Sequence, residues 1–322
     1  MKPATPFGHF HRLAETAAFL GMFFTLAGLL GRYVWFFEFF THFKPQLAVC
    51  FLVYAGLELA ARRHRHAVVS LAFAAFNAVP VLLLLLPSGT QAQATPPASS
   101  PAHLRILHAN ILTCNTNFTA LLSLVAQEHP DVIVLLEPDT RWLNDLSPLT
   151  NSYPVWAAMP REDNLGAAIY CGTNARSAEI FRLSDPEAVP STLARIAVGD
   201  KTLTVVGIHA LAPYNSAMWC GRNSFSLELA KNLCGVEGPL VVTGDFNNTP
   251  WSAHFRQFLE ASGLRDSAQG HGPQPTWPVA APPLMRIPLD HCFHSGAVRI
   301  LAKRPGPDIG SDHLPLIIDV SF

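Results

Sequence analysis

Long apolar stretches fill the first quarter of this 322-residue chain. They cover residues 16–37, 46–61 and 67–86. A helix needs roughly 20 apolar residues to cross the hydrocarbon core of a bilayer. Within lipid, the backbone polar groups of such a segment have to be satisfied inside the segment itself, which favours a helix. Residues 1–87 are therefore predicted to form a membrane segment with about three transmembrane helices.

Basic residues beside these stretches predict how the segment is oriented. A cluster at 62–66 (RRHRH) separates the second stretch from the third, and Lys2 and Arg12 lie near the N-terminus. Because basic residues flanking spans stay on the cytoplasmic side, we expect a multi-pass protein of the inner (plasma) membrane. Residues after Pro87 would then lie on the extracytoplasmic (periplasmic) side. A cleavable signal peptide is the alternative for the first stretch, and it is disfavoured because further spans follow.

Charge and composition divide the chain into two parts. Residues 1–102 carry 7 Lys and Arg against 3 Asp and Glu, whereas residues 103–322 carry 15 against 20. Between them, residues 88–103 (SGTQAQATPPASSPAH) are small, polar and rich in proline, so we expect a flexible linker. The six cysteines show no CxxC spacing, which argues against a zinc cluster. The sequence leaves their disulfide pairing open.

The pattern after the linker predicts a sheet-rich soluble domain over residues 104–322. Short apolar runs at 104–110, 132–136, 203–209 and 240–245 are typical of buried strands. Further strands are predicted at 167–170, 192–198, 288–293, 298–302 and 315–320, and helices near 118–125 and 252–261. Many strands are apolar on both faces and must be covered on both sides. The predicted fold is an α/β sandwich of two packed sheets with outer helices.

The strand at 240–245 has the most informative ending, Gly244-Asp245-Phe246-Asn247. With a period of two along an extended chain, Asp245 and Asn247 point the same way and Phe246 turns back to the core. A carboxylate there can hold a metal or orient water, and the neighbouring amide can bond a phosphoryl oxygen without charge repulsion. The alternative for this segment alone is an Asp/Asn turn that closes the strand.

Polar residues recur at the ends of other strands as well. They are Asn110, Glu137, His209, Asp245, Asn247, Asp290, His291, Ser311, Asp312 and His313. Each one alone is explained by a turn or by a solvated strand end. Together they bring carboxylates, amides and histidines to the same structural point, which is a ligand set for one hard divalent cation and a phosphate.

With these residues in place, the chain resembles the endonuclease/exonuclease/phosphatase superfamily, the deoxyribonuclease I-like group. Segments in the family's order are LRILHAN at 104–110, DVIVLLE at 131–137, GAAIY at 166–170, VVGIHA at 205–210, VVTGDFN at 241–247, PLDHCF at 288–293 and GSDHLP at 310–315. The GDFNxTPWS run, the TWP segment and the apolar N-terminus are most similar to bacterial membrane-anchored members. The resemblance implies a four-layer α/β sandwich.

The resemblance also implies a metal site. Glu137 would be the principal Mg²⁺ ligand, and Asn110 and Asp312 would complete or orient the site. Mn²⁺ is the alternative ion. Since Mg²⁺ keeps several waters and takes only one or two carboxylates, a site with few direct ligands suits it.

Catalytic roles follow from the same resemblance. Asp245 would position and activate the attacking water, and Asn247 would bond the phosphoryl oxygen that gains charge. His313 would donate to the phosphate, with Asp290 holding its imidazole in the required tautomer. His209 would be a second donor to the phosphate or the leaving group.

The implied activity is metal-dependent hydrolysis of a phosphodiester or phosphomonoester by in-line attack of water. Trp277, Arg286, Arg222 and Asn223 are candidate substrate contacts. The substrate would be a lipid head group, a nucleotide or nucleic acid, and the acidic balance of residues 103–322 weakly disfavours nucleic acid. An extracytoplasmic nuclease and a catalytically silent phosphate-binding module are the alternatives. The bilayer is the expected partner of the N-terminal helices, and no protein partner is predicted.

Overall fold

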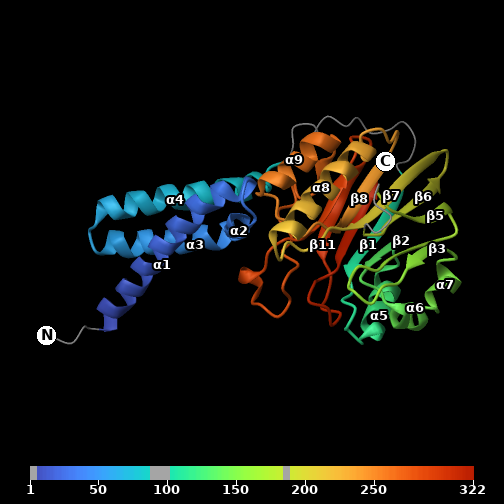
Figure 1. Cartoon of the computed structure of the whole chain (residues 1–322), viewed down its shortest axis with the longest axis horizontal. Helices are drawn as coiled ribbons and strands as arrows, with labels where there is room; N and C mark the ends of the chain where they lie inside the picture. Colours follow the sequence, from blue (N-terminus) through green and yellow to red (C-terminus); the bar gives the residue numbers. More distant parts are fainter. Residues whose placement is uncertain (1–5, 88–101, 184–188) are drawn as a thin grey trace.

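The computed structural model of the protein describes residues 6–87, 102–183 and 189–322. Its N-terminal part is helical and extends away from a β-sheet sandwich (Figure 1). The helices of this part are α1 (Pro6–Gly28), η1 (Leu29–Arg32), α2 (Trp35–Glu38), η2 (Phe39–Thr41), α3 (Lys44–Ala60) and α4 (His64–Leu83). Most of the linker predicted at 88–103 lies outside the described residues, and the first strand already begins at His103.

Two of these helical stretches, His11–Arg32 and His64–Leu83, are long and apolar enough to cross a membrane. The pair Trp35–Thr41 and Lys44–Ala60 passes the same test when taken together, but it is bent by 58°. The stretch expected at 16–37 is therefore not one helix, because the backbone becomes extended at Val34 (φ −134°, ψ 120°). The stretch comprises the end of α1, η1 and the start of α2.

The rest of the chain forms two six-stranded mixed sheets. Sheet A has the order β11-β12-β1-β2-β4-β3 and sheet B the order β5-β6-β7-β8-β10-β9. The strands of sheet A are β1 (His103–Asn110), β2 (Val132–Leu136), β3 (Val155–Met159), β4 (Ala167–Cys171), β11 (Arg299–Pro305) and β12 (Leu316–Ser321). Those of sheet B are β5 (Ala175–Phe181), β6 (Ser191–Val198), β7 (Lys201–His209), β8 (Leu240–Asp245), β9 (Arg265–Asp266) and β10 (Asp290–His294).

Each sheet contains one parallel pair, β1 with β2 and β7 with β8. Strands β12 and β10 run antiparallel to their neighbours β1 and β8. The C-terminal ends of the four parallel strands and the N-terminal starts of β10 and β12 therefore meet at one edge of the sandwich. Polar residues placed at these ends converge there.

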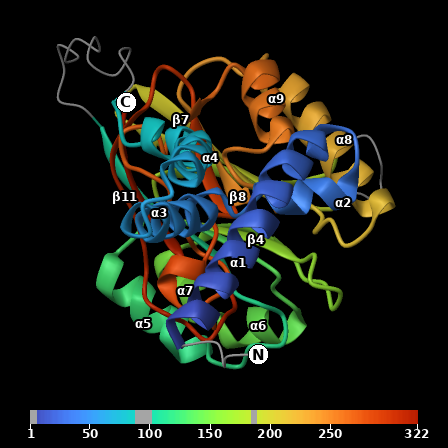
Figure 2. The ribbon, with the colours of Figure 1, turned by 90° about the vertical axis from the view of Figure 1, so that its left-hand side faces the viewer.

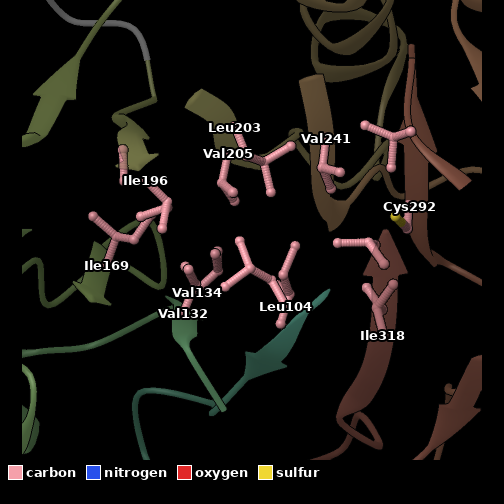
Figure 3. Close-up of a cluster of buried hydrophobic side chains, with 14 of the residues drawn as sticks. Leu104, Val132, Val134, Ile169, Ile196, Leu203, Val205, Val241, Cys292 and Ile318 are labelled. Carbon is pink, nitrogen blue, oxygen red and sulfur yellow. The ribbon is translucent and has the colours of Figure 1, made fainter. Parts of the chain in front are cut away.

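Aliphatic side chains from both sheets fill the space between them. Figure 3 shows Val132 and Val134 of sheet A facing Leu203 and Val205 of sheet B. The sheets approach closely at Gly207, where an added Cβ would lie 2.4 Å from both Thr192 Oγ1 and Val134 Cγ1. Only a residue without a side chain fits between the two sheets at this point.

Helices cover the two outer faces, which completes the predicted four-layer arrangement (Figure 2). On sheet A lie α5 (Phe118–Glu128), α6 (Thr140–Asp145) and α7 (Leu149–Ser152), and on sheet B lie α8 (Ser216–Leu233) and α9 (Ala253–Ser262). The sequence prediction missed α8, whose apolar and polar residues show little helical segregation. It correctly placed the ends of α9, since Ser252 caps its N-terminus and Gly263 ends it in a left-handed conformation. All six cysteines are free thiols.

Candidate active site

Polar side chains from both sheets gather at the edge where the parallel strands end. Asn110 is the last residue of β1, and Glu137 directly follows β2. In sheet B, His209 ends β7 beside Asp245, and Asp245 is paired with Asp290 across the β8–β10 ladder. The predicted convergence of strand ends therefore occurs, and it joins the two sheets at one site.

Asn110 and Glu137 form the sheet A side of this site. The Asn110 amide nitrogen donates to Glu137 Oε1 at 2.8 Å and lies 3.5 Å from Asp245 Oδ2. Glu137 has a left-handed backbone (φ 67°), which a residue other than glycine adopts only when its surroundings impose it. Burial raises the pKa of the Glu137 carboxyl to about 7. Its Oε2 has no hydrogen-bond partner among the described residues.

Asp290 lies between two imidazoles. His313 Nδ1 is 2.8 Å from Asp290 Oδ2, and His108 Nε2 is 2.9 Å from Asp290 Oδ1. Burial disfavours the charge of Asp290, but these histidines outweigh it and hold the pKa of Asp290 well below its usual range. Burial likewise disfavours the charged imidazole of His313, yet Asp290 and Asp245 raise the pKa of His313 to about 10. Asp290 therefore contacts the imidazole of His313 through Nδ1 and leaves Nε2 directed toward Asp245.

Asp245 is the centre of the site. Its Oδ2 lies 3.6 Å from His313 Nε2 and 3.7 Å from His209 Nε2. Burial raises the pKa of Asp245 to about 8. Burial, together with the charge of His313, lowers the pKa of His209 to about 4, so His209 is the neutral imidazole of the pair. Glu137 Oε1 lies 3.8 Å from His209 Nε2 and closes the ring of groups.

Asn247 lies beside Asp245, but in a turn and not on the extended strand that was predicted. Strand β8 ends at Asp245, so the period of two does not continue, and Asn247 takes a left-handed turn conformation (φ 47°). Its backbone N–H donates to Asp245 Oδ1 at 2.8 Å, and its side-chain Nδ2 donates to the Ala210 carbonyl at 2.8 Å. An amide nitrogen carries two protons, so one donor remains for another acceptor.

The donor set fits a divalent cation on the Glu137 side. Oδ1 of Asp312, like Oε2 of Glu137, is buried without a partner among the described residues. Asp245, Asp290 and His313 also hold ligand-type atoms within 4.8 Å of one another. Both oxygens of Asp290 are already bonded to histidines, however, so these three residues form an acid–histidine unit. The unsatisfied carboxylate oxygens are those a hard cation would take.

The four predicted substrate contacts differ in where they lie. Trp277 donates from Nε1 to Asp312 Oδ2 at 3.1 Å, and its ring centroid is 6.4 Å from that of His313. Arg286 instead holds its own loop by donating to the carbonyls of residues 279 and 281. Asn223 accepts from Arg222 at 2.8 Å. The Trp277 ring therefore borders the site, whereas the Arg286 guanidinium stabilises the loop through its hydrogen bonds to backbone carbonyls.

Arg222 requires a correction, because it is buried and does not face a substrate. Its guanidinium donates to the Asn247 carbonyl at 2.8 Å and to Glu38 Oε2 at 2.5 Å. Glu38 belongs to α2 in the N-terminal helical part and also accepts from Ser252 Oγ and Trp219 Nε1, each at 2.6 Å. The N-terminal helices thus contact the residue beside Asp245 through one intervening side chain.

Sequence reasoning missed two contributors to this site, His108 and Glu38. Each of these two residues has a sequence feature that could have identified it. His108 lies two residues before Asn110 on the same strand and therefore on the same face. Glu38 is an ionisable residue inside an apolar stretch, which is uncommon without a structural or functional reason.

Comparisons with known proteins agree with this architecture. The profile of the Endonuclease/Exonuclease/phosphatase family matches residues 107–313. Among solved structures, D. rerio TDP2 complexed with single strand DNA product is similar, with a TM-score of 0.58 at 17% identity over 69% of this chain and 100% of that chain. The human Nocturnin catalytic domain with bound sulfate anion is similar with a TM-score of 0.56 and 21% identity, over 71% of this chain and 100% of that chain. An endonuclease/exonuclease/phosphatase from Bacteroides vulgatus is similar with a TM-score of 0.56 and 16% identity, over 68% of this chain and 98% of that chain. No curated protein sequence gives a significant match.

Proposed function

Because the chain belongs to the endonuclease/exonuclease/phosphatase family, we propose that it is a membrane-anchored, Mg²⁺-dependent phosphoesterase. It would hydrolyse a phosphodiester or a phosphomonoester by in-line attack of water. The observation that carries this proposal is the arrangement around Asp245. One of its oxygens faces two imidazoles, and the Glu137 carboxylate, which has an unsatisfied oxygen, lies 3.8 Å from the His209 imidazole.

Glu137 would hold the ion, with Asn110 orienting its carboxylate and Asp312 completing the site. When bound there, Mg²⁺ would supply positive charge to a phosphoryl oxygen, which stabilises the charge that develops in phosphoryl transfer. A cation would also relieve the burial of Glu137, whose ionised form is disfavoured in this environment.

The remaining residues would act on water and phosphate directly. Asp245 would accept a hydrogen bond from the attacking water and orient it. Protonated His313 would donate to a phosphate oxygen, held in place by Asp290. Neutral His209 and the free amide proton of Asn247 would add further donors around the phosphorus. Asp245, His313 and His209 are buried, Asn247 is half-buried, and each is held by hydrogen bonds or by close neighbours, so little reorganisation is needed during the reaction.

We further propose that residues 1–87 form the membrane segment, residues 88–103 the linker and residues 104–322 the catalytic domain. Two or three helices of the first part are apolar enough to span a bilayer, which supports this division. The basic cluster at 62–66 would keep the α3–α4 turn in the cytoplasm. The domain would then lie on the periplasmic side of the inner membrane.

The loop around η3 (Pro283–Met285) favours a substrate presented at the membrane surface. Leu284 and Met285 are 85% and 52% exposed, and Gln46 of α3 bonds the carbonyls of Leu284 and Arg286. The base of this loop includes Trp277, which borders the site. Phospholipid head groups and other lipid-linked phosphates are therefore the leading substrate class. An extracytoplasmic nuclease is the second candidate, since the similar TDP2 structure holds a DNA product.

The test uses the full-length protein in detergent micelles. We expect hydrolysis of bis-p-nitrophenyl phosphate with Mg²⁺ or Mn²⁺ and none with EDTA. Asp245→Asn should lower turnover by about 10²-fold to 10⁴-fold, the usual contribution of a positioned acid or base. Asp266→Asn is the matched control, since Asp266 is a buried aspartate of β9 outside the site. Full Mg²⁺-dependent activity in Asp245→Asn would refute the role assigned to Asp245.

A substrate panel separates the candidates. Phospholipid vesicles, plasmid DNA and sugar phosphates would be compared with and without EDTA. Hydrolysis of DNA alone would favour the nuclease, and no hydrolysis of any substrate would favour the silent binding module.

A periplasm-dependent reporter fused after Phe322 should be active. An inactive reporter would place the domain in the cytoplasm.

A further inference from the structure

A cavity of about 250 Å³ lies between the N-terminal helices and the α/β sandwich. Its walls come from the end of α1, from η1, from the start of α3, from the second half of α4 and from the first turns of α9. It therefore lies where the apolar helices end and the sandwich begins. If the helices span a bilayer, this is the level of the lipid head groups. The inference below rests on the proposed anchoring and not on the proposed hydrolysis.

Basic side chains from three elements line this cavity. They are Arg32 of η1, Lys44 of α3 and Arg256 of α9. Lys44 Nζ lies 4.7 Å from the centroid of the Phe76 ring, and Arg256 is close enough for the two positive charges to repel each other. In the parts of the chain that the structure describes, none of the three lies within ion-pair distance of an acid. The cavity thus holds positive charge that the protein leaves uncompensated.

Glu38 is the one acid among the lining residues, and it does not neutralise them. Its Oε1 accepts from Ser252, and its Oε2 accepts from Arg222 and Trp219. Both carboxylate oxygens are therefore used on the side of the sandwich, and the buried Arg222 guanidinium balances their charge.

A second observation is an unsatisfied acceptor on the cavity wall. Asn77 of α4 is fully buried and lines the cavity. Its Nδ2 donates to Thr25 Oγ1 at 3.0 Å and to the Phe73 carbonyl at 2.9 Å. Its Oδ1 has no partner among the described residues. A buried acceptor without a partner is unfavourable unless a ligand donates to it.

We propose that this cavity binds the head group of an anionic phospholipid. The phosphate would lie among Arg32, Lys44 and Arg256, and a head-group hydroxyl would donate to Asn77 Oδ1. At about 250 Å³, the space is below the ~300–1,000 Å³ of pockets that enclose a whole small ligand, so it suits a head group. The acyl chains would lie outside it, along exposed apolar side chains such as Leu29 and Phe76.

The test measures lipid retained by the full-length protein, with EDTA present so that hydrolysis plays no part. Protein in detergent is mixed with phosphatidylcholine or with phosphatidylglycerol, and retained lipid is counted by native mass spectrometry. We expect preferential retention of phosphatidylglycerol. The double variant Lys44→Gln/Arg256→Gln should weaken it by roughly 25-fold, since each basic residue near an anionic lipid surface contributes about fivefold.

The matched control is Arg62→Gln/Arg65→Gln, which removes the same charge from the α3–α4 turn and should retain phosphatidylglycerol like the unmodified protein. Lys44→Arg/Arg256→Lys keeps both charges and should also retain it, which separates loss of charge from misfolding. Equal loss in the control and cavity variants would overturn the proposal. So would displacement of the lipid by millimolar inorganic phosphate, because the site would then be one for free phosphate. A chain that is not anchored would instead fail to sediment with membranes, whatever lipid it retains.

Discussion

Arg222 and Glu38 form an ion pair in which both side chains are almost completely buried, at 1% and 2% exposure. The two residues are 184 positions apart, one in α8 of the sandwich and one in α2 of the N-terminal helices. Because Arg222 also bonds the Asn247 carbonyl, the pair links the N-terminal helices to the turn beside Asp245.

We therefore expect Glu38→Gln to impair both stability and turnover. Breaking a buried pair by removing one partner costs about 3–5 kcal/mol, because the other charge stays buried. Turnover should fall while KM stays near its original value, since the change acts on the position of Asn247. Thermal unfolding and steady-state kinetics of the full-length protein test this. Glu58→Gln, which removes an equally buried acid far from the site, should leave turnover unchanged. Equal kinetics in both variants would contradict the link.

Removal of the ion should reveal the role of Glu137. Saturation with Mg²⁺ at about 100 times its Kd should stabilise the folded protein by about 2.7 kcal/mol. Glu137→Gln should lose this stabilisation and should not be destabilised by EDTA. Glu128→Gln, which alters only a surface ion pair with Arg105 and Arg304, is the control. Thermal melts in Mg²⁺ and in EDTA make the measurement, and an unchanged Mg²⁺ effect in Glu137→Gln would place the ion elsewhere.

His108 should matter through Asp290. His108→Leu leaves Asp290 Oδ1 without its partner and loosens the carboxylate that orients His313. Losses of about 10-fold to 100-fold are typical when such supporting partners are removed from an active site. His108→Gln restores a donor and should recover most of the turnover. If Leu and Gln behave alike in kcat, His108 is only part of the core.

Acid should destabilise the fold through His291. Burial among the rings of Phe255, Phe246 and Phe293 lowers the pKa of His291 to about 3, from an ordinary value near 6.5. The unfolded chain then binds the extra proton first, so the stability is present above about pH 6.5 and is lost as the pH falls toward 3. The slope is at most about 1.4 kcal/mol per pH unit. His291→Gln should flatten this part of a denaturation-versus-pH curve, and an unchanged slope would contradict the assignment.

A larger residue at Gly207 should destabilise the contact between the two sheets. Gly207→Ala adds a methyl group where two side-chain atoms already lie 2.4 Å away. Such overpacking typically costs about 1–3 kcal/mol. Gly235→Ala, where an added Cβ meets no atom within 4 Å, is the control. Urea denaturation compares the two, and equal midpoints would show that the sheets can separate locally without loss.

Much of this architecture is predictable from sequence, because a buried strand that ends in polar residues leaves a strong local signal. Glu137 and Asp245 stand at such ends, and Asp290 and His313 stand where antiparallel strands begin at the same edge. The strand β5 and the helix α8 were missed because their apolar residues follow no clear period. The ion pair of Arg222 could not be predicted from the neighbouring sequence either, because its partner Glu38 lies in another part of the chain. Only the folded structure brings the two residues together.

The burial of Arg222 bears on how this protein can be studied. A recombinant fragment cut at the linker would keep the Arg222 guanidinium and lose the Glu38 carboxylate that neutralises it. Such a fragment would expose an unpaired positive charge on its surface, and it would be prone to aggregation or to binding of anions. A soluble form of the sandwich therefore calls for an uncharged replacement at position 222, or for a version of the chain that retains α2.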